Sequence, residues 1–118
     1  MAKSIMQDTK ECYLCRKEAE KAGYWGPLPN TGLHKHHFIF GKGNRPLAEE
    51  HGLWGYVCAA RHHEYGPEAP HVNANVRKQL AADAQREFMK THTRKEFTDI
   101  FHENFIPGES YEGEEDGR

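Results

Sequence analysis

The sequence lacks any apolar run that approaches the ~20 residues a helix needs to cross a bilayer, which excludes a transmembrane protein. Hydrophobic residues make up only 36% of the 118 residues and charged residues 29%, so the chain is polar for its size. The first twelve residues lack the apolar centre of a secretory signal peptide. We therefore expect one domain with a modest core, a cytoplasmic location and no membrane partner.

Cysteine is scarce, and its number is odd. Three cysteines in a chain without a recognisable export signal disfavour a disulfide framework, whereas nine histidines are unusually many. A cysteine set completed by histidine is typical of structural zinc sites. The composition therefore points to a bound metal that supplements a small hydrophobic core.

The net charge of −2 combines two unlike parts of the chain. Residues 109–118 carry five acidic residues and one basic residue, a charge of −4, which leaves +2 on the remaining body. We expect 107–118 to be an acidic, disordered tail. The mildly basic body is compatible with nucleic-acid binding.

Hydrophobic periodicity and breaker residues predict an α+β domain over residues 12–106, after a loose N-terminal segment 1–11. Two strands are expected, over 33–40 and 53–58. The expected helical segments are 16–22 closed by Gly23, a single turn at 46–51, a helix that starts in 59–64, a helix from Asn73 or Asn75 to about Met89, and a last helix that begins at the capping box Thr93–Glu96 and includes Phe105.

Cys12-x-x-Cys15 is the first cluster of chemical interest, because two thiolates at this spacing can hold one tetrahedral Zn²⁺ from a tight turn. The other two ligands must come from elsewhere, and Cys58 with His62, four residues apart, can supply them. The alternative is a thioredoxin-like redox pair, which prefers a strand–helix–strand unit that this sequence does not contain. The residues therefore favour structural zinc.

His36 and His37 form the second cluster, on the first predicted strand. Adjacent residues of a strand face opposite sides, so the two imidazoles cannot do the same job. One can bind a metal while the other faces a substrate. The second strand and the helix after it would return His62 and His63 toward this pair.

Taken together, these motifs resemble the HNH endonucleases, the ββα-metal or His-Me finger group, and in particular its small phage- or prophage-type members. The resemblance covers roughly residues 12–106. It is carried by Cys12-x-x-Cys15, His36-His37, Asn44 within Phe40-Gly-Lys-Gly-Asn-Arg45, Cys58, His62-His63 and His71-Val-Asn73.

The resemblance implies a zinc-stapled ββα-metal core with C-terminal helices, and a metal-dependent endonuclease that hydrolyses DNA. His37 would be the general base, and Asn44 the middle residue of the catalytic triad. His36, His63 and His71 would bind the catalytic ion, which would be Mg²⁺, Mn²⁺, Ni²⁺ or Zn²⁺. Phosphodiester hydrolysis indeed needs an activated water, a base that titrates near neutrality and a cation.

The sequence departs from the family pattern at two places. Arg61 stands where the zinc half-site usually has its second ligand, which leaves both His62 and His63 as candidates for the zinc. The family asparagine usually lies closer to the second half-site, and His51 is the alternative to Asn44 for that role.

Double-stranded DNA is the expected partner. Four basic residues gather near the proposed active loop and are candidate phosphate contacts, namely Lys35, Lys42, Arg45 and Arg61. Three alternatives remain: a zinc-stabilised DNA- or protein-binding module without catalysis, an RNA-directed nuclease with the same finger, and a nuclease that acts only with a phage protein partner in a packaging complex.

Overall fold

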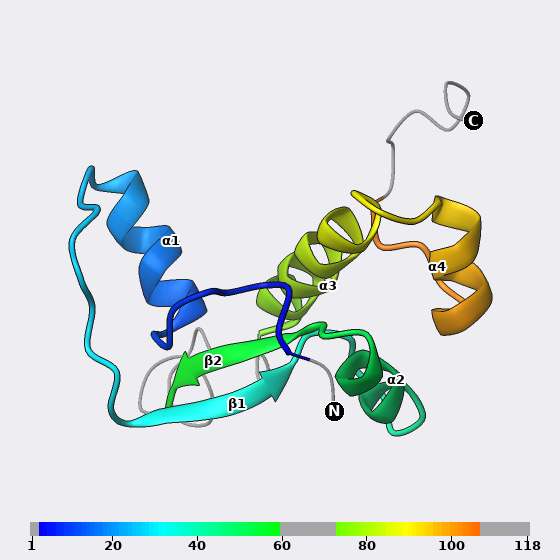
Figure 1. The fold of residues 1–118 in the computed structure, drawn as a ribbon, viewed down its shortest axis with the longest axis horizontal. Coiled ribbons are helices and arrows are strands. Elements are labelled where there is room, and N and C mark those ends of the chain that lie inside the picture. The colour runs from blue at the N-terminus through cyan, green and yellow to red at the C-terminus, as the bar shows by residue number, and fades with distance from the viewer. Residues whose placement is uncertain (1–2, 60–72, 107–118) are drawn as a thin grey trace.

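The computed structural model describes residues 3–59 and 73–106 and has a mixed α/β architecture, which confirms the expected class (Figure 1). Four helices surround one two-stranded antiparallel sheet in the described ranges. In chain order the elements are α1 (Tyr13–Lys21), β1 (Leu33–His37), α2 (Asn44–Glu50), β2 (Trp54–Cys58), α3 (Ala74–Phe88) and α4 (Arg94–Phe101). Within these ranges no helix has the length and apolar character that crossing a bilayer requires.

The sheet is a hairpin whose connection contains α2, so α2 lies beyond one end of it (Figure 1). Leu33 pairs with Cys58 at one end and His37 with Trp54 at the other. The strand predicted over 33–40 therefore ends early, at His37. The reason is that Phe38 and Ile39 turn into the core, where both have 0% exposure, and Gly41 adopts a φ of +113° that starts the turn into α2.

Helix α1 begins three residues before its predicted start. Cys12 is its N-cap, because its sulfur accepts a hydrogen bond from the backbone N–H of Cys15. The predicted end is confirmed, since Gly23 has the positive φ of +85° that commonly follows a helix. Both cysteines of the C-x-x-C motif therefore lie in the first turn of a helix.

The N-terminal segment 3–11 differs from the loose segment that we expected, because it is hydrogen-bonded along β2. Ile5 donates its N–H to the carbonyl of Gly52 at 2.9 Å, and Tyr56 donates its N–H to Oε1 of Gln7 at 2.8 Å. Gly55 permits this approach, since a Cβ there would lie 2.7 Å from the same Gln7 oxygen. The segment thus lies against β2, the strand whose last residue is Cys58.

The C-terminal helices begin where their capping residues predict. Asn73 caps α3, and Thr93 with Glu96 forms the expected capping box at α4. The predicted last helix is too long, however, because His102 adopts a left-handed φ of 61° that ends α4 at Phe101. Phe105 therefore lies in the segment after the helix. The helix expected from 59–64 lies outside the described residues beyond its first position, and so does the acidic tail.

The core joins the loop after β1 to all three later helices. Its buried members are Phe38, Ile39, Ala48, Leu53, Leu80, Ala81, Ala84, Phe88, Phe97 and Phe101. Edge-to-face contacts between aromatic rings stabilise the core, and the ring centroids of Tyr13 and Phe38 lie 4.9 Å apart in one such contact. The Tyr13 hydroxyl donates to Asp83 at 2.8 Å, which attaches α1 to α3.

One polar side chain, Gln85, lies in this core with 0% exposure. Its Oε1 accepts the N–H of Phe105 at 2.6 Å, and its Nε2 donates to Oδ1 of Asn104 at 2.7 Å. Arg94 donates to the same Asn104 oxygen at 2.8 Å. The amide of Gln85 therefore holds the segment after α4 against α3.

Gln85→Met keeps the side-chain volume but leaves the N–H of the half-buried Phe105 without its acceptor. We expect the free energy of unfolding to fall by ~1–3 kcal/mol, the usual cost of an unsatisfied buried group. Urea denaturation of both proteins measures this difference. Gln79→Met, on an exposed face of the same helix, is the control and should change stability by less than ~0.5 kcal/mol. Equal effects of the two substitutions would contradict the assigned role.

Candidate metal centre and histidine cavity

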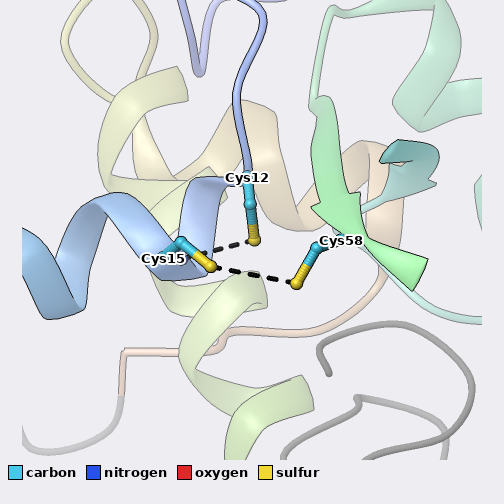
Figure 2. A group of neighbouring side chains, drawn as sticks. All are labelled: Cys12, Cys15 and Cys58. Carbon is cyan, nitrogen blue, oxygen red and sulfur yellow. Dashed lines mark hydrogen bonds between the residues drawn. The ribbon is translucent and has the colours of Figure 1, made fainter. Parts of the chain in front are cut away.

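The three cysteines of the chain converge from two elements. Cys12 and Cys15 come from the start of α1, and Cys58 is the last residue of β2 (Figure 2). Their sulfur atoms all lie within 4.8 Å of one another, and no disulfide joins them. A bridge between Cys12 and Tyr56 holds α1 beside β2 and so brings the thiols together.

The spacing of the sulfurs fits a tetrahedral metal ion. Zinc–sulfur bonds of ~2.3 Å in a tetrahedron separate two sulfurs by ~3.8 Å, and the Sγ atoms of Cys15 and Cys58 are 3.8 Å apart. The backbone N–H of Cys15 also points at the Cys12 sulfur, at 3.3 Å, where it would stabilise a thiolate. The three cysteines can therefore hold a metal ion, and their thiolate character suits structural zinc.

Burial raises the pKa of the Cys12 and Cys15 thiols above the ordinary value. The neighbouring thiols raise the pKa of Cys15 further, whereas backbone hydrogen bonds from Cys15 and Cys58 offset part of the rise at Cys12. A redox-active C-x-x-C pair has the opposite property, a lowered thiol pKa. The position of the C-x-x-C pair at the N-terminus of α1 is consistent with a redox pair, whereas the third thiol beside it, that of Cys58, is not. The cluster is thus better suited to a cation, which displaces the protons.

The predicted fourth zinc ligand lies outside the described residues, whether it is His62 or His63. The same holds for His71 and Arg61. Among the described residues, the three cysteines are the one group of three or more histidine, cysteine or carboxylate side chains placed to share an ion.

A second feature lies at the opposite end of the hairpin, a cavity of about 330 Å³ that both predicted site histidines line. His36 is 6% exposed, and its ring packs edge-on against Phe40 at a centroid distance of 5.2 Å. The His37 side chain is 24% exposed. The two imidazoles therefore differ in burial, as their alternation on a strand predicts, yet they share one cavity because the strand ends there.

Glu49 of α2 is the residue that sequence reasoning missed. Its Oε1 lies 2.8 Å from Nε2 of His37, and the ammonium of Lys35 lies 2.8 and 2.9 Å from its two oxygens. These hydrogen bonds, first that of Lys35 and then that of His37, hold the pKa of Glu49 below its usual value. The sequence signal for this residue was a carboxylate on the short helix between the two strands. Two adjacent glutamates occupy that helix, and only the fold shows which of them contacts His37.

Asn44, the predicted middle residue, donates its amide N–H to the carbonyl of Phe40 at 2.9 Å. It thus closes the turn after β1, and a direct part in catalysis stays a prediction. His51, the alternative, packs its ring against Phe88 and Phe101 at 5.7 and 6.3 Å. That position puts the half-buried His51 against α3 and α4, and it is not among the residues that line the histidine cavity.

The predicted phosphate contacts fall into two kinds. Lys42 and Arg45 are exposed and line the cavity that His36 and His37 share. Lys35 lines it too, but its charge is engaged by Glu49, and its ammonium lies 4.1 Å from the centre of the Trp54 ring. Lys42 and Arg45 are therefore the better placed of the described candidates to meet an anion.

Cys15→Ser replaces a strong zinc ligand by a weak one. We expect the purified wild type to contain one zinc per chain, and the variant to lose it together with ~4 kcal/mol of stability at free zinc 1,000-fold above Kd. Elemental analysis and denaturation measure the two quantities. In excess chelator the two proteins should have nearly equal stability. A zinc-free wild type, or a variant of equal stability with zinc present, would contradict the metal centre.

Glu49→Gln tests the ion cluster through pH. Because the folded pKa of Glu49 is lowered, its charge contributes stability above the unfolded pKa of ~4.5, and this contribution disappears as pH falls through the folded pKa. The stability difference between wild type and variant should be present above about pH 4.5 and shrink below it. Comparing the two proteins cancels the acid loss of zinc. Glu50→Gln, an exposed neighbour, is the control, and a difference independent of pH would refute the pairing.

Comparison with models of known protein families, with curated proteins and with solved structures finds no match. The arrangement of the site must therefore carry the functional argument. Its two parts are a cluster of three thiols suited to zinc and a cavity with two histidines, one of them paired with a carboxylate.

Proposed function

We propose that this chain is a metal-dependent endonuclease of the HNH type that hydrolyses DNA phosphodiester bonds, with His37 as general base. The observation that carries the proposal is the pair formed by Nε2 of His37 and Oε1 of Glu49, 2.8 Å apart, at the wall of a cavity that also contains His36. A histidine oriented by a carboxylate is a recurrent arrangement of proton-transfer sites.

The Glu49 carboxylate determines which nitrogen of His37 can act as a base. An ionised carboxylate only accepts hydrogen bonds, so Nε2 must carry the hydrogen and Nδ1 is the basic nitrogen. When Nδ1 takes a proton from the attacking water, the new imidazolium is stabilised by the same carboxylate. Lys35 keeps Glu49 ionised. Its ammonium also neutralises part of the carboxylate charge, and this reduces the stabilisation of the His37 imidazolium.

The other residues of the cavity suit the remaining needs of hydrolysis. His36 offers a buried imidazole at the cavity wall, and with His63 and His71 it would hold a divalent cation. When bound, such an ion supplies charge stabilisation at the scissile phosphate and at the leaving oxygen. The exposed Lys42 and Arg45 would bind the phosphates. Asn44 keeps the loop that carries them in one conformation.

Plasmid cleavage by zinc-loaded protein tests the proposal, with Mg²⁺, Mn²⁺ or Ni²⁺ added and EDTA as a blank. His37→Ala should reduce the rate ~10²–10⁴-fold, the usual contribution of a general base. Glu49→Gln should reduce it by a smaller factor. His92→Ala, an exposed histidine of the segment between α3 and α4, is the matched control and should cleave like the wild type.

The outcomes separate the proposal from its alternatives. Equal cleavage by wild type and His37→Ala would refute the assigned base. Failure of a folded, zinc-loaded wild type to cleave with any metal would favour a binding module or a nuclease that needs a partner. Cleavage of RNA in preference to DNA would favour the RNA-directed alternative.

A further inference from the structure

Phe40 separates two cavities of nearly equal size. The first, of about 330 Å³, is the one that His36 and His37 line. The second, of about 320 Å³, lies between α3 and the segment after α4. Its lining residues are Phe40, Arg77, Lys78, Ala81, Glu103, Asn104 and Phe105. Because Phe40 lines both, the two cavities adjoin at this ring.

Cationic side chains stand on both sides of this aromatic ring. Lys42 and Arg45 line the histidine cavity, while Arg77 and Lys78 line the second. The guanidinium carbon of Arg77 lies 5.5 Å from the centre of the Phe40 ring, which holds the group at the boundary between the cavities. The Lys78 side chain is exposed.

The far wall of the second cavity is held in place by the buried amide network. Asn104 receives hydrogen bonds from Gln85 at 2.7 Å and from Arg94 at 2.8 Å, and it donates to the carbonyl of Ile106 at 3.2 Å. Gln85 also binds the N–H of Phe105. A wall fixed by four hydrogen bonds belongs to a preformed cavity, which binds a ligand without the cost of ordering a loop.

We propose that this second cavity is a phosphate subsite, in which Arg77 and Lys78 hold the DNA backbone next to the scissile phosphate. The inference rests on the proposed function and adds the path of the substrate, which crosses Phe40. A DNA strand presents a phosphate every ~3.4 Å of helix rise, so a phosphate that flanks the reacting one is near enough to occupy the adjoining cavity. Arginine is suited to this task by its planar fork of donors.

Glu103 gives the proposal a second, opposite test. Its exposed carboxylate lines the same cavity, and it would repel a phosphate there. Removing this charge should therefore strengthen DNA binding, whereas removing the two cations should weaken it. A purely structural role of the cavity predicts neither effect.

The experiment measures binding rather than cleavage, by fluorescence anisotropy of a labelled DNA duplex with zinc-loaded protein and no added divalent metal. Arg77→Gln with Lys78→Gln should lower the affinity at least ~10-fold at 0.1 M salt, and should reduce the slope of log K against log salt by ~2. Glutamine keeps the aliphatic stem over Phe40. Glu103→Gln should raise the affinity.

The matched control is Arg86→Gln with Lys95→Gln, which removes the same charge elsewhere. Arg86 lies nine residues after Arg77 and so on the opposite side of α3, and the Lys95 side chain is 82% exposed on α4. An equal loss of affinity in the control would overturn the subsite, because net charge would then explain it. Unchanged binding by the Arg77, Lys78 variant, or no binding by the wild type, would also overturn it.

Failure of the subsite and failure of the proposed function give different results. If the Arg77, Lys78 variant binds DNA more weakly than the control does but the wild type cleaves none, the subsite stands as a DNA-binding site and the nuclease does not. If the wild type cleaves plasmid while the Arg77, Lys78 variant and the control bind alike, the nuclease stands and the subsite does not.

Discussion

The convergence of three thiols at one end of the hairpin is the constraint on which the rest of the structure depends. It joins the start of α1 to the end of β2, and the hydrophobic core alone holds α1 weakly, because no residue of this helix is fully buried. A single ion bound there closes a loop that contains both strands and α2. In a chain this polar, such a cross-link would add stability that the small hydrophobic core cannot supply.

The hairpin separates this metal centre from the proposed chemistry. Cys58 pairs with Leu33, the first residue of β1, whereas His37 is the last residue of that strand. The cysteine cluster and His37 therefore lie four residues apart along β1, a distance of ~14 Å. An ion bound at the cysteines would therefore be structural, and it would act on His37 only by maintaining the register of the two strands. At the other end, Glu49 orients His37, and the turn that Asn44 closes brings Lys42 and Arg45 to the same cavity.

Much of this could be predicted from sequence because it rests on local rules. The capping residues Asn73 and Thr93, the glycine after α1 and the C-x-x-C spacing each specify a feature within four residues. What failed depended on distant contacts. The length of β1 is decided by the burial of Phe38. The path of the chain after the left-handed His102 is decided by the hydrogen bonds of Gln85 to Asn104 and Phe105, some twenty positions away. The pairing of Glu49 with His37 could not be predicted for the same reason, since only the fold brings α2 against His37.

X-ray absorption at the zinc edge, on protein purified without added metal, shows directly whether the three thiols share one ion. We predict a first shell of three sulfurs at ~2.3 Å and one nitrogen at ~2.0–2.1 Å. A fully ligated shell of this kind would place Cys12, Cys15 and Cys58 on one ion. A folded protein that contains no zinc, or a shell made only of nitrogen and oxygen, would contradict it.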